Sequence, residues 1–191
     1  MEPGTYLGIC IGVIGLGEQE TQWQGKTRYV EKVRFLFEIP EETIEMDGEQ
    51  KPRQLSVDFS VAKRATSRIR QFLSGWMGKM LSDEEYANLE LYDLLGRNAL
   101  LGVVRSEDGQ YANISTATPL RKSETPQTAV SAPILFDADE WDDAVFETLP
   151  DYLQERLKQS AQYKNAHLPA QEVSVEAAEQ EAAEDSEEVP F

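Results

Sequence analysis

Residues 32–39 have the sequence KVRFLFEI, the clearest alternating stretch in the chain. The apolar side chains on one side of the alternation are Val33, Phe35, Phe37 and Ile39. The charged side chains that point the other way are Lys32, Arg34 and Glu38. A period of two is that of a β-strand with one face in a core. The stretch therefore predicts a strand whose second face carries charge.

Two more alternating segments flank this strand. Residues 7–13 alternate apolar residues with glycines and Cys10, and the segment is expected to end at residues 15–17, before a polar loop at 18–26. After a break that begins at Pro40 and includes the turn dipeptide Asp47-Gly48, residues 55–59 form a third predicted strand.

The middle of the chain changes to a helical period. Ile69, Phe72, Leu73 and Trp76 recur at steps of three and four, which predicts an amphipathic helix over residues 65–76. Ser82 and Glu85 fit a capping box at the start of a short second helix. Residues 99–103 and 111–118 are then predicted strands, joined by a hairpin loop at 106–109.

The resulting order is strand, strand, strand, helix, strand, strand. It best matches a mainly β, OB-fold-like five-stranded barrel with a helix between strands 3 and 4. This body is expected over residues 1–120. Residues 121–165 predict a Ser/Thr/Pro-rich linker, a short extended piece and a helical extension that packs on the barrel. Residues 166–191 predict a disordered acidic tail, since eight acidic residues and no Lys or Arg follow His167.

Charge is distributed unevenly along the 191 residues. The chain has 18 Lys and Arg against 35 Asp and Glu, a formal net charge of −17, and such acidity normally argues against a nucleic-acid partner. Residues 1–122, however, carry 15 basic and 18 acidic residues, a net charge of −3. Residues 123–191 carry 3 and 17, a net charge of −14. The body can therefore still present a basic surface.

Catalytic and metal chemistry finds little support in the sequence. One cysteine (Cys10) and one histidine (His167) exclude an intramolecular disulfide and a Cys/His zinc site. The N-terminal glycines match neither phosphate-binding glycine motif. The acidic clusters suggest solvated charge, with calcium binding as an alternative. We predict a protein that is not an enzyme and uses no metal or cofactor. Without a signal peptide or a long apolar segment, we expect it to be soluble and cytoplasmic, with no membrane partner.

Basic and aromatic residues gather in the predicted body. Cations that follow the phosphates and aromatic rings that stack on bases are the usual means of binding single strands. The candidate DNA-binding residues are Trp23, Lys26, Arg28, Tyr29, Lys32, Arg34, Arg53, Lys63, Arg64, Arg68, Arg70, Lys79, Arg97, Arg105 and Tyr111. The alternative is that the aromatic residues belong to the core or its rim and that the bases are ordinary surface.

The C-terminus resembles the tip of bacterial single-stranded DNA-binding proteins, an acidic run followed by an aliphatic residue, Pro and Phe. The residues that carry the resemblance are Asp185, Glu187, Glu188, Val189, Pro190 and Phe191. It implies a protein-interaction tip in which Phe191 fills an apolar pocket of a partner and its carboxylate pairs with a cation there.

The body also resembles a family of phage-encoded proteins associated with single-stranded DNA binding. The resemblance rests on PGTYLGICIGVIGLG near the N-terminus, the block SRIRQFLSGWMGKMLSDEEYANLELYDLLGRNALLGVV and the following GQYANI. It implies a non-catalytic protein, in the host cytoplasm, that coats single strands in phage DNA replication, recombination and repair and recruits other proteins through its tip.

Two other functions remain open at this point. One is a phage structural or assembly protein whose β-barrel makes only protein contacts. The other is an acidic DNA-mimic inhibitor that does not bind DNA. The sequence leaves open whether the chain forms a homo-oligomer.

Overall fold

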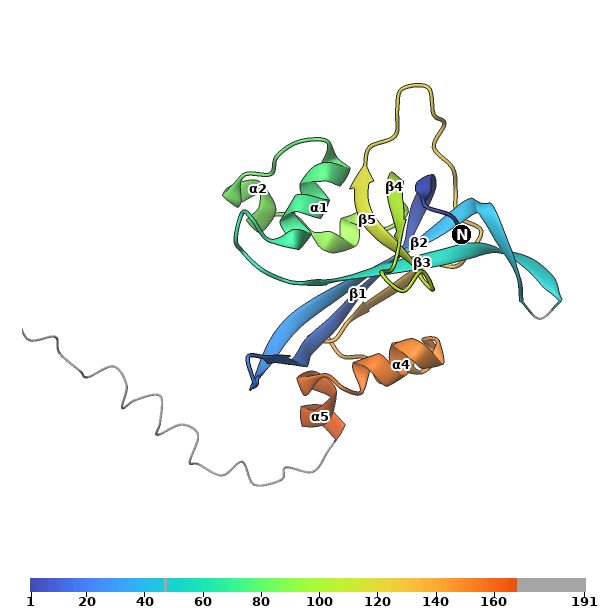
Figure 1. The fold of residues 1–191 in the computed structure, drawn as a ribbon. Helices are drawn as coiled ribbons and strands as arrows, with labels where there is room; N and C mark the ends of the chain where they lie inside the picture. Colours follow the sequence, from blue (N-terminus) through green and yellow to red (C-terminus); the bar gives the residue numbers. More distant parts are fainter. Residues whose placement is uncertain (47, 168–191) are drawn as a thin grey trace, which may run out of the picture.

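The structure, a computed structural model, describes residues 1–46 and 48–167 (Figure 1). The predicted tail and its tip lie outside the described residues, apart from residues 166 and 167, which end the last helix.

Five antiparallel strands form the main sheet, in the order β3-β2-β1-β4-β5. They are β1 (Gly4–Trp23), β2 (Lys26–Met46), β3 (Glu49–Ser60), β4 (Asn98–Arg105) and β5 (Ala112–Thr118). The sheet curls so that β3 and β5 come into contact, and α1 (Arg68–Met77), which follows β3 in the chain, packs against both strands. The predicted mainly β, OB-fold-like architecture is confirmed, in the form of an open, curled sheet.

Three strands extend further than the alternation indicated. β1 continues past Gly17 to Trp23, so the predicted loop at 18–26 is wrong. The end of β1 and the start of β2 instead form a hairpin arm. It turns at Gln24 and Gly25, whose positive φ angles of 50° and 77° suit a two-residue β-turn. β2 likewise continues past Pro40, through an irregularity between Ile39 and Thr43, and pairs with the start of β3. Cross-strand pairing, which the local pattern does not contain, extends these strands.

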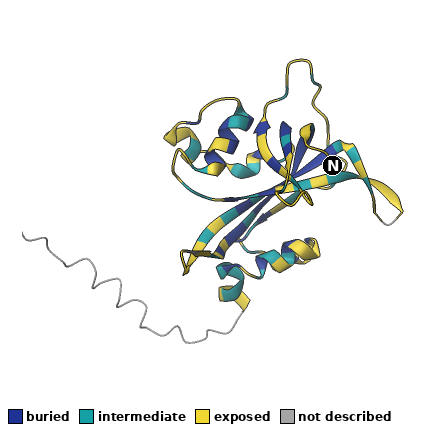
Figure 2. Cartoon of the chain, viewed as in Figure 1, coloured by how far each residue is buried: buried dark blue, intermediate teal, exposed yellow. Residues whose placement is uncertain are grey.

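The inner core fills the curled sheet. It joins Phe35 and Phe37 of β2 to Phe72 and Trp76 of α1, with buried residues from every strand of the main sheet around them. Figure 2 shows this burial as dark blue bands along the central strands, while the β1–β2 hairpin and the β2–β3 hairpin become exposed toward their turns. The side chains that define this face are those of the alternating pattern in residues 33–39.

The outer face of β1 and β2 is buried as well. The register of β1 against β2 shifts at Ile11 and at Leu16, and such bulges turn the following side chains to the other face. Ile11, Ile14 and Leu16 consequently join Leu36 in a second core on the outside of the sheet.

The C-terminal extension supplies the other half of this outer core. It consists of β6 (Ile134–Asp137), which pairs in parallel with β1, then α3 (Asp143–Thr148), α4 (Asp151–Leu157) and α5 (Ala161–His167). Leu153 and Leu157 of α4 are fully buried in the outer core. The extension lies on the side of the sheet opposite α1 and α2 (Asp83–Ala87) (Figure 1). The prediction that it packs on the body is confirmed.

Polar clamps hold the linker that leads to the extension. Glu38 on the outer face of β2 is fully buried, and its carboxylate accepts hydrogen bonds of 2.8 Å from the N–H groups of both Val130 and Ser131. Asn98 exchanges a pair of hydrogen bonds with the backbone of Gln127, at 2.9 and 2.8 Å. The linker is therefore tied to β2 through Glu38 and to β4 through Asn98.

Candidate functional site

A stripe of cations runs along the outer face of β2. Residues 26–38 of β2 pair with β1 without interruption on the β2 side, so every second residue shares a face. The cations of the stripe are Lys26, Arg28, Lys32 and Arg34. Lys26 and Arg28 are exposed, and neither they nor Lys32 form an ion pair with a described residue. Farther along the same face come Leu36 and Glu38, which the extension and the linker cover.

Arg34 is the member of the stripe that is paired with an acid. It lies opposite Asp58 of β3, and its guanidinium donates two hydrogen bonds to that carboxylate, at 2.6 and 2.9 Å. These two hydrogen bonds raise the pKa of Arg34. The Arg34 side chain is 16% exposed. Arg34 thus links β2 to β3, and only a small part of its guanidinium is accessible to a ligand.

Two shallow hollows continue the stripe across β3. Lys32, Ser60 and Arg68 line the first, and Arg68 lines the second together with Asn113 at the seam between β3 and β5. Asp58 borders both. Arg68 sits over the ring of Phe59, 5.3 Å from its centroid, which orients its side chain. Lys63 and Arg64 follow in the exposed segment between β3 and α1. These residues form a cationic surface from the β1–β2 arm to the N-terminus of α1.

The tyrosine predicted to accompany the stripe lies elsewhere. Tyr29 is 54% exposed, but it occupies the opposite face of β2. Its cross-strand partner there is Glu20, and Glu18 pairs with Glu31 two positions away. Tyr29 and the cations of the stripe therefore lie on opposite faces of β2, whereas the backbone of Trp23 pairs with Lys26 at the end of the arm.

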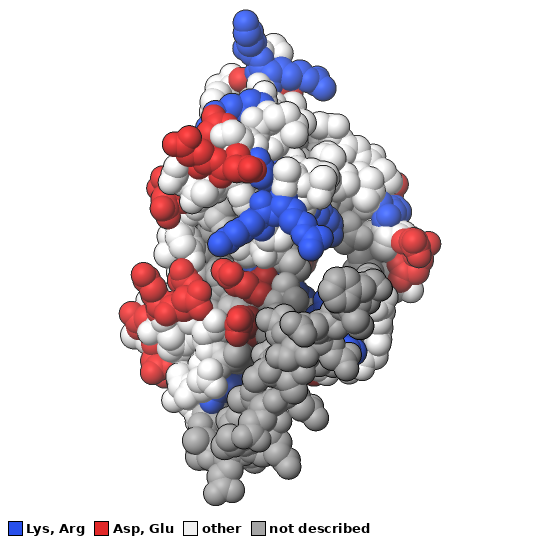
Figure 3. All heavy atoms as spheres, turned by 90° about the vertical axis from the view of Figure 1, so that its left-hand side faces the viewer, with Lys and Arg blue, Asp and Glu red and all other residues white. Residues whose placement is uncertain are grey.

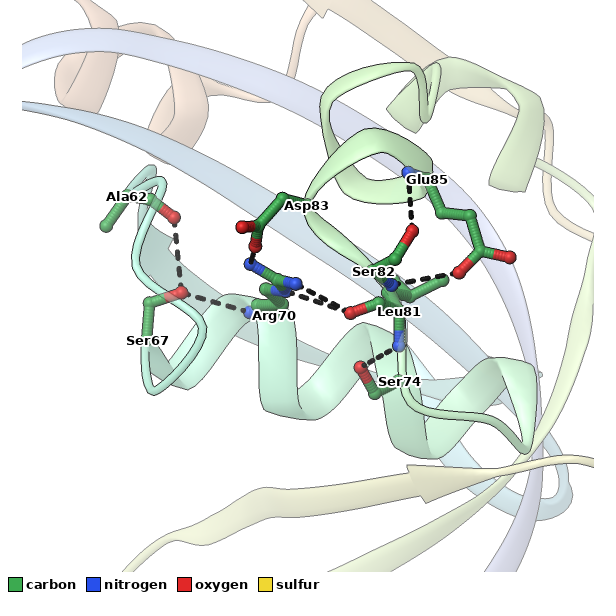
Figure 4. A network of polar contacts seen from close by, with 8 residues as sticks. All are labelled: Ala62, Ser67, Arg70, Ser74, Leu81, Ser82, Asp83 and Glu85. Atoms are coloured by element: carbon green, nitrogen blue, oxygen red, sulfur yellow. Dashed lines mark hydrogen bonds and ion pairs between the residues drawn. The ribbon is translucent and has the colours of Figure 1, made fainter.

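Arg70 has a structural role. It is 5% exposed and donates two hydrogen bonds to the carbonyl of Leu81, at 2.7 and 3.2 Å, and one to Asp83 at 2.5 Å (Figure 4). The predicted capping box follows directly, with Ser82 and Glu85 bonded to each other's N–H groups. Arg70 joins α1 to α2, and its guanidinium is not accessible to a phosphate.

The remaining predicted residues are scattered. Arg105 pairs with Glu2 at 2.6 Å, Lys79 pairs with Glu85 at 2.5 Å, and Arg97 donates to the sulfur of Met77 at 3.2 Å. Arg53 is half-buried on β3, and its Nε has no hydrogen-bond partner among the described residues. Tyr111, 64% exposed, follows the β4–β5 loop. The structure does not bring these residues together with the stripe.

Acidic residues border the cationic surface. Burial and the charges of Asp139, Asp137 and Glu18 raise the pKa of Glu31, next to Lys32 in β2. Figure 3 shows Lys and Arg side chains gathered in separate groups with Asp and Glu side chains beside them. Within residues 1–46 and 48–167, no group of three or more His, Cys, Asp or Glu side chains is arranged to hold a metal ion. None of the helices there is long and apolar enough to cross a membrane.

Two features of the site escaped the sequence pattern. Asp58 is the partner of Arg34, a pairing that depends on the β2–β3 register. Tyr152 of α4 is 51% exposed, and burial raises the pKa of its hydroxyl while the charge of Arg34 lowers it. The exposed face of the helical pattern in residues 151–157 could have indicated Tyr152 as a surface residue, but not which strand it would meet.

Searches against protein-family models, curated proteins and solved structures found no match for this chain.

Proposed function

We propose that this protein is a non-catalytic single-stranded DNA-binding protein that uses the cationic surface around β2. The observation that carries the proposal is the stripe of Lys26, Arg28 and Lys32 on the outer face of an OB-fold-like sheet, unpaired with any described acid. Cations spaced along a strand can follow a phosphate backbone without reading its sequence. Lys63, Arg64 and Arg68 extend this path beyond β3.

The acidic tail and its tip complete the proposal. They would recruit replication or recombination proteins while the body coats exposed strands in a phage-infected cell. This part rests on the sequence of residues 185–191 and on its resemblance to the bacterial tips. Deletion of Phe191 is expected to abolish partner capture and to leave DNA affinity unchanged.

A salt titration with matched variants tests the DNA-binding proposal. The full chain is titrated into fluorescein-labelled oligo-dT and followed by fluorescence anisotropy at several salt concentrations. The slope of log K against log salt is negative, and each lost phosphate contact makes it shallower by about 0.7 on a single strand. The K26A/R28A variant should therefore make the slope shallower by about 1.4.

The control variant is R121A/K122A, which removes the same two residue types from the exposed linker. It should bind as the unaltered protein does. Equal losses in the two variants would show non-specific attraction and would contradict the assigned surface. Absence of binding at low salt would contradict the DNA-binding proposal itself and favour a protein-contact or DNA-mimic role.

A further inference from the structure

The outer face of β2 is bordered by α4, which brings an aromatic ring to the cation stripe. Leu153 and Leu157 anchor α4 in the outer core, which also contains Leu36. Leu36 is two residues from Arg34 on the same face of β2. Tyr152, next to the buried Leu153, is thereby held at the edge of this face.

The ring of Tyr152 is available to a ligand. It is 51% exposed and has no ring contact with another described aromatic residue, although Trp141, Phe146, Tyr163 and His167 of the same extension pack together. The fold therefore provides no internal partner for this side chain.

A second cation accompanies the ring. Arg156 lies one turn after Tyr152 on the same side of α4. Its Nε is buried without a hydrogen-bond partner in the described part of the chain. Tyr152 thus offers an exposed ring on the helix that packs in the outer core beside the cations of β2, and cations with an exposed ring are the combination that binds a nucleotide through its phosphate and base.

We propose that Tyr152 is a base-stacking residue and that α4 forms one wall of the single-strand binding groove, with the β2 stripe as its floor. The inference rests on the proposed DNA binding and deepens it. The ligand is an unpaired base of any sequence, because every base offers a stacking face. The C-terminal extension then contributes to binding and not only to stability.

The experiment compares Tyr152→Leu with Tyr152→Phe in the full chain. Binding is measured by fluorescence anisotropy with labelled oligo-dT of about 16 nucleotides. Loss of the stack in Tyr152→Leu should raise the Kd by about 5-fold to about 150-fold, whereas Tyr152→Phe keeps the ring and should match the unaltered protein. Tyr29→Leu, a change at an equally exposed tyrosine on the opposite face of β2, is the matched control and should have no effect.

An abasic oligomer of the same length separates stacking from other roles. It keeps the phosphates and lacks the bases, so Tyr152→Leu and the unaltered protein should bind it equally. Equal weakening on both oligomers would overturn the stacking role, as would unchanged oligo-dT binding by Tyr152→Leu. Failure of the unaltered protein to bind oligo-dT would instead refute the proposed function. Thermal melting of each variant identifies any loss caused by unfolding.

Discussion

The two faces of the β1–β2 sheet are covered by different parts of the chain. The inner face packs against α1 and the other strands of the curled sheet. The outer face packs against β6 and the helices of the C-terminal extension, beyond a long linker. The inner core follows from a period of two in adjacent strands, whereas the outer core requires two bulges in β1 and a distant segment. One face thus builds the barrel, and the other is divided between an apolar half under the extension and a cationic half beside it.

Truncation of one buried side chain in each core gives the largest expected effects. Phe35→Ala removes the ring that contacts Phe59, Phe72 and Trp76 and should lower the free energy of unfolding by about 3–5 kcal/mol. Leu153→Ala in the outer core should cost about 2–5 kcal/mol. Denaturant unfolding measures both losses.

Hydrogen exchange shows whether the two cores unfold separately. In Leu153→Ala, amides of α4 and β6 should exchange faster, while those of β2 and β3 keep most of their protection. In Phe35→Ala, protection should fall throughout the sheet. Uniform acceleration in both variants would mean that the two faces form one cooperative unit.

Removal of the Glu38 carboxylate tests the clamp at the boundary of the outer face. Glu38→Ala leaves the N–H groups of Val130 and Ser131 without their acceptor and should cost about 1–3 kcal/mol. Burial alone would raise the pKa of Glu38, but hydrogen bonds from Ser131 and Val130 outweigh it and hold the pKa below its ordinary value.

The sign of this pKa shift predicts a pH dependence. Since the pKa of Glu38 is lower in the folded state, its stabilising contribution is complete above the ordinary pKa of 4.5 and is lost as the pH falls through the folded-state pKa. Exchange of the Val130 and Ser131 amides should therefore accelerate, relative to intrinsic rates, only at acid pH. An unchanged protection ratio across this range would contradict the clamp.

Gly17→Ala tests how α5 is held against β1. Gly17 has φ +65°, and a Cβ there would lie 2.3 Å from Oε1 of Gln162, which accepts a hydrogen bond from the N–H of Glu18. The backbone strain should cost about 1–2 kcal/mol, and the amide of Glu18 should lose protection. Gly25→Ala is the control, because its φ is also positive but no atom lies within 4 Å of its Cβ. Equal loss of Glu18 protection in both variants would argue against the Gln162 contact.

Asp58→Asn gives the smallest expected effect. The Arg34–Asp58 pair is partly exposed, so its loss should change stability by at most about 1 kcal/mol. If the cationic half of the outer face binds single strands, freeing Arg34 should steepen the salt dependence by up to about 0.7. A salt titration by fluorescence anisotropy measures this change, and a shallower slope would remove Arg34 from the interface.

The strand and helix order was predictable from local patterns. The alternation at residues 33–39 placed Phe35 in the core, and Ser82 with Glu85 marked a helix start that forms as expected. The candidate site was less predictable. Arg70 belongs to the same helical segment as Arg68, yet it is buried on the carbonyl of Leu81, while Arg68 stays at the surface. Composition alone cannot separate two such cations, because the difference lies in what packs beside each of them.

The sequence by itself determined the order of the main strands and helices, the apolar face of residues 33–39, and the concentration of acidity in the last third of the chain, because propensity, periodicity and charge are local properties. The tertiary structure decided that the central parts of β1 and β2 are buried on both faces, that Arg34 pairs with Asp58, and that α4 packs in the outer core with Leu36. These outcomes depend on register, on bulges at Ile11 and Leu16, and on the docking of the extension. They arise from contacts between segments far apart in the chain, where burial of apolar surface outweighs local preference.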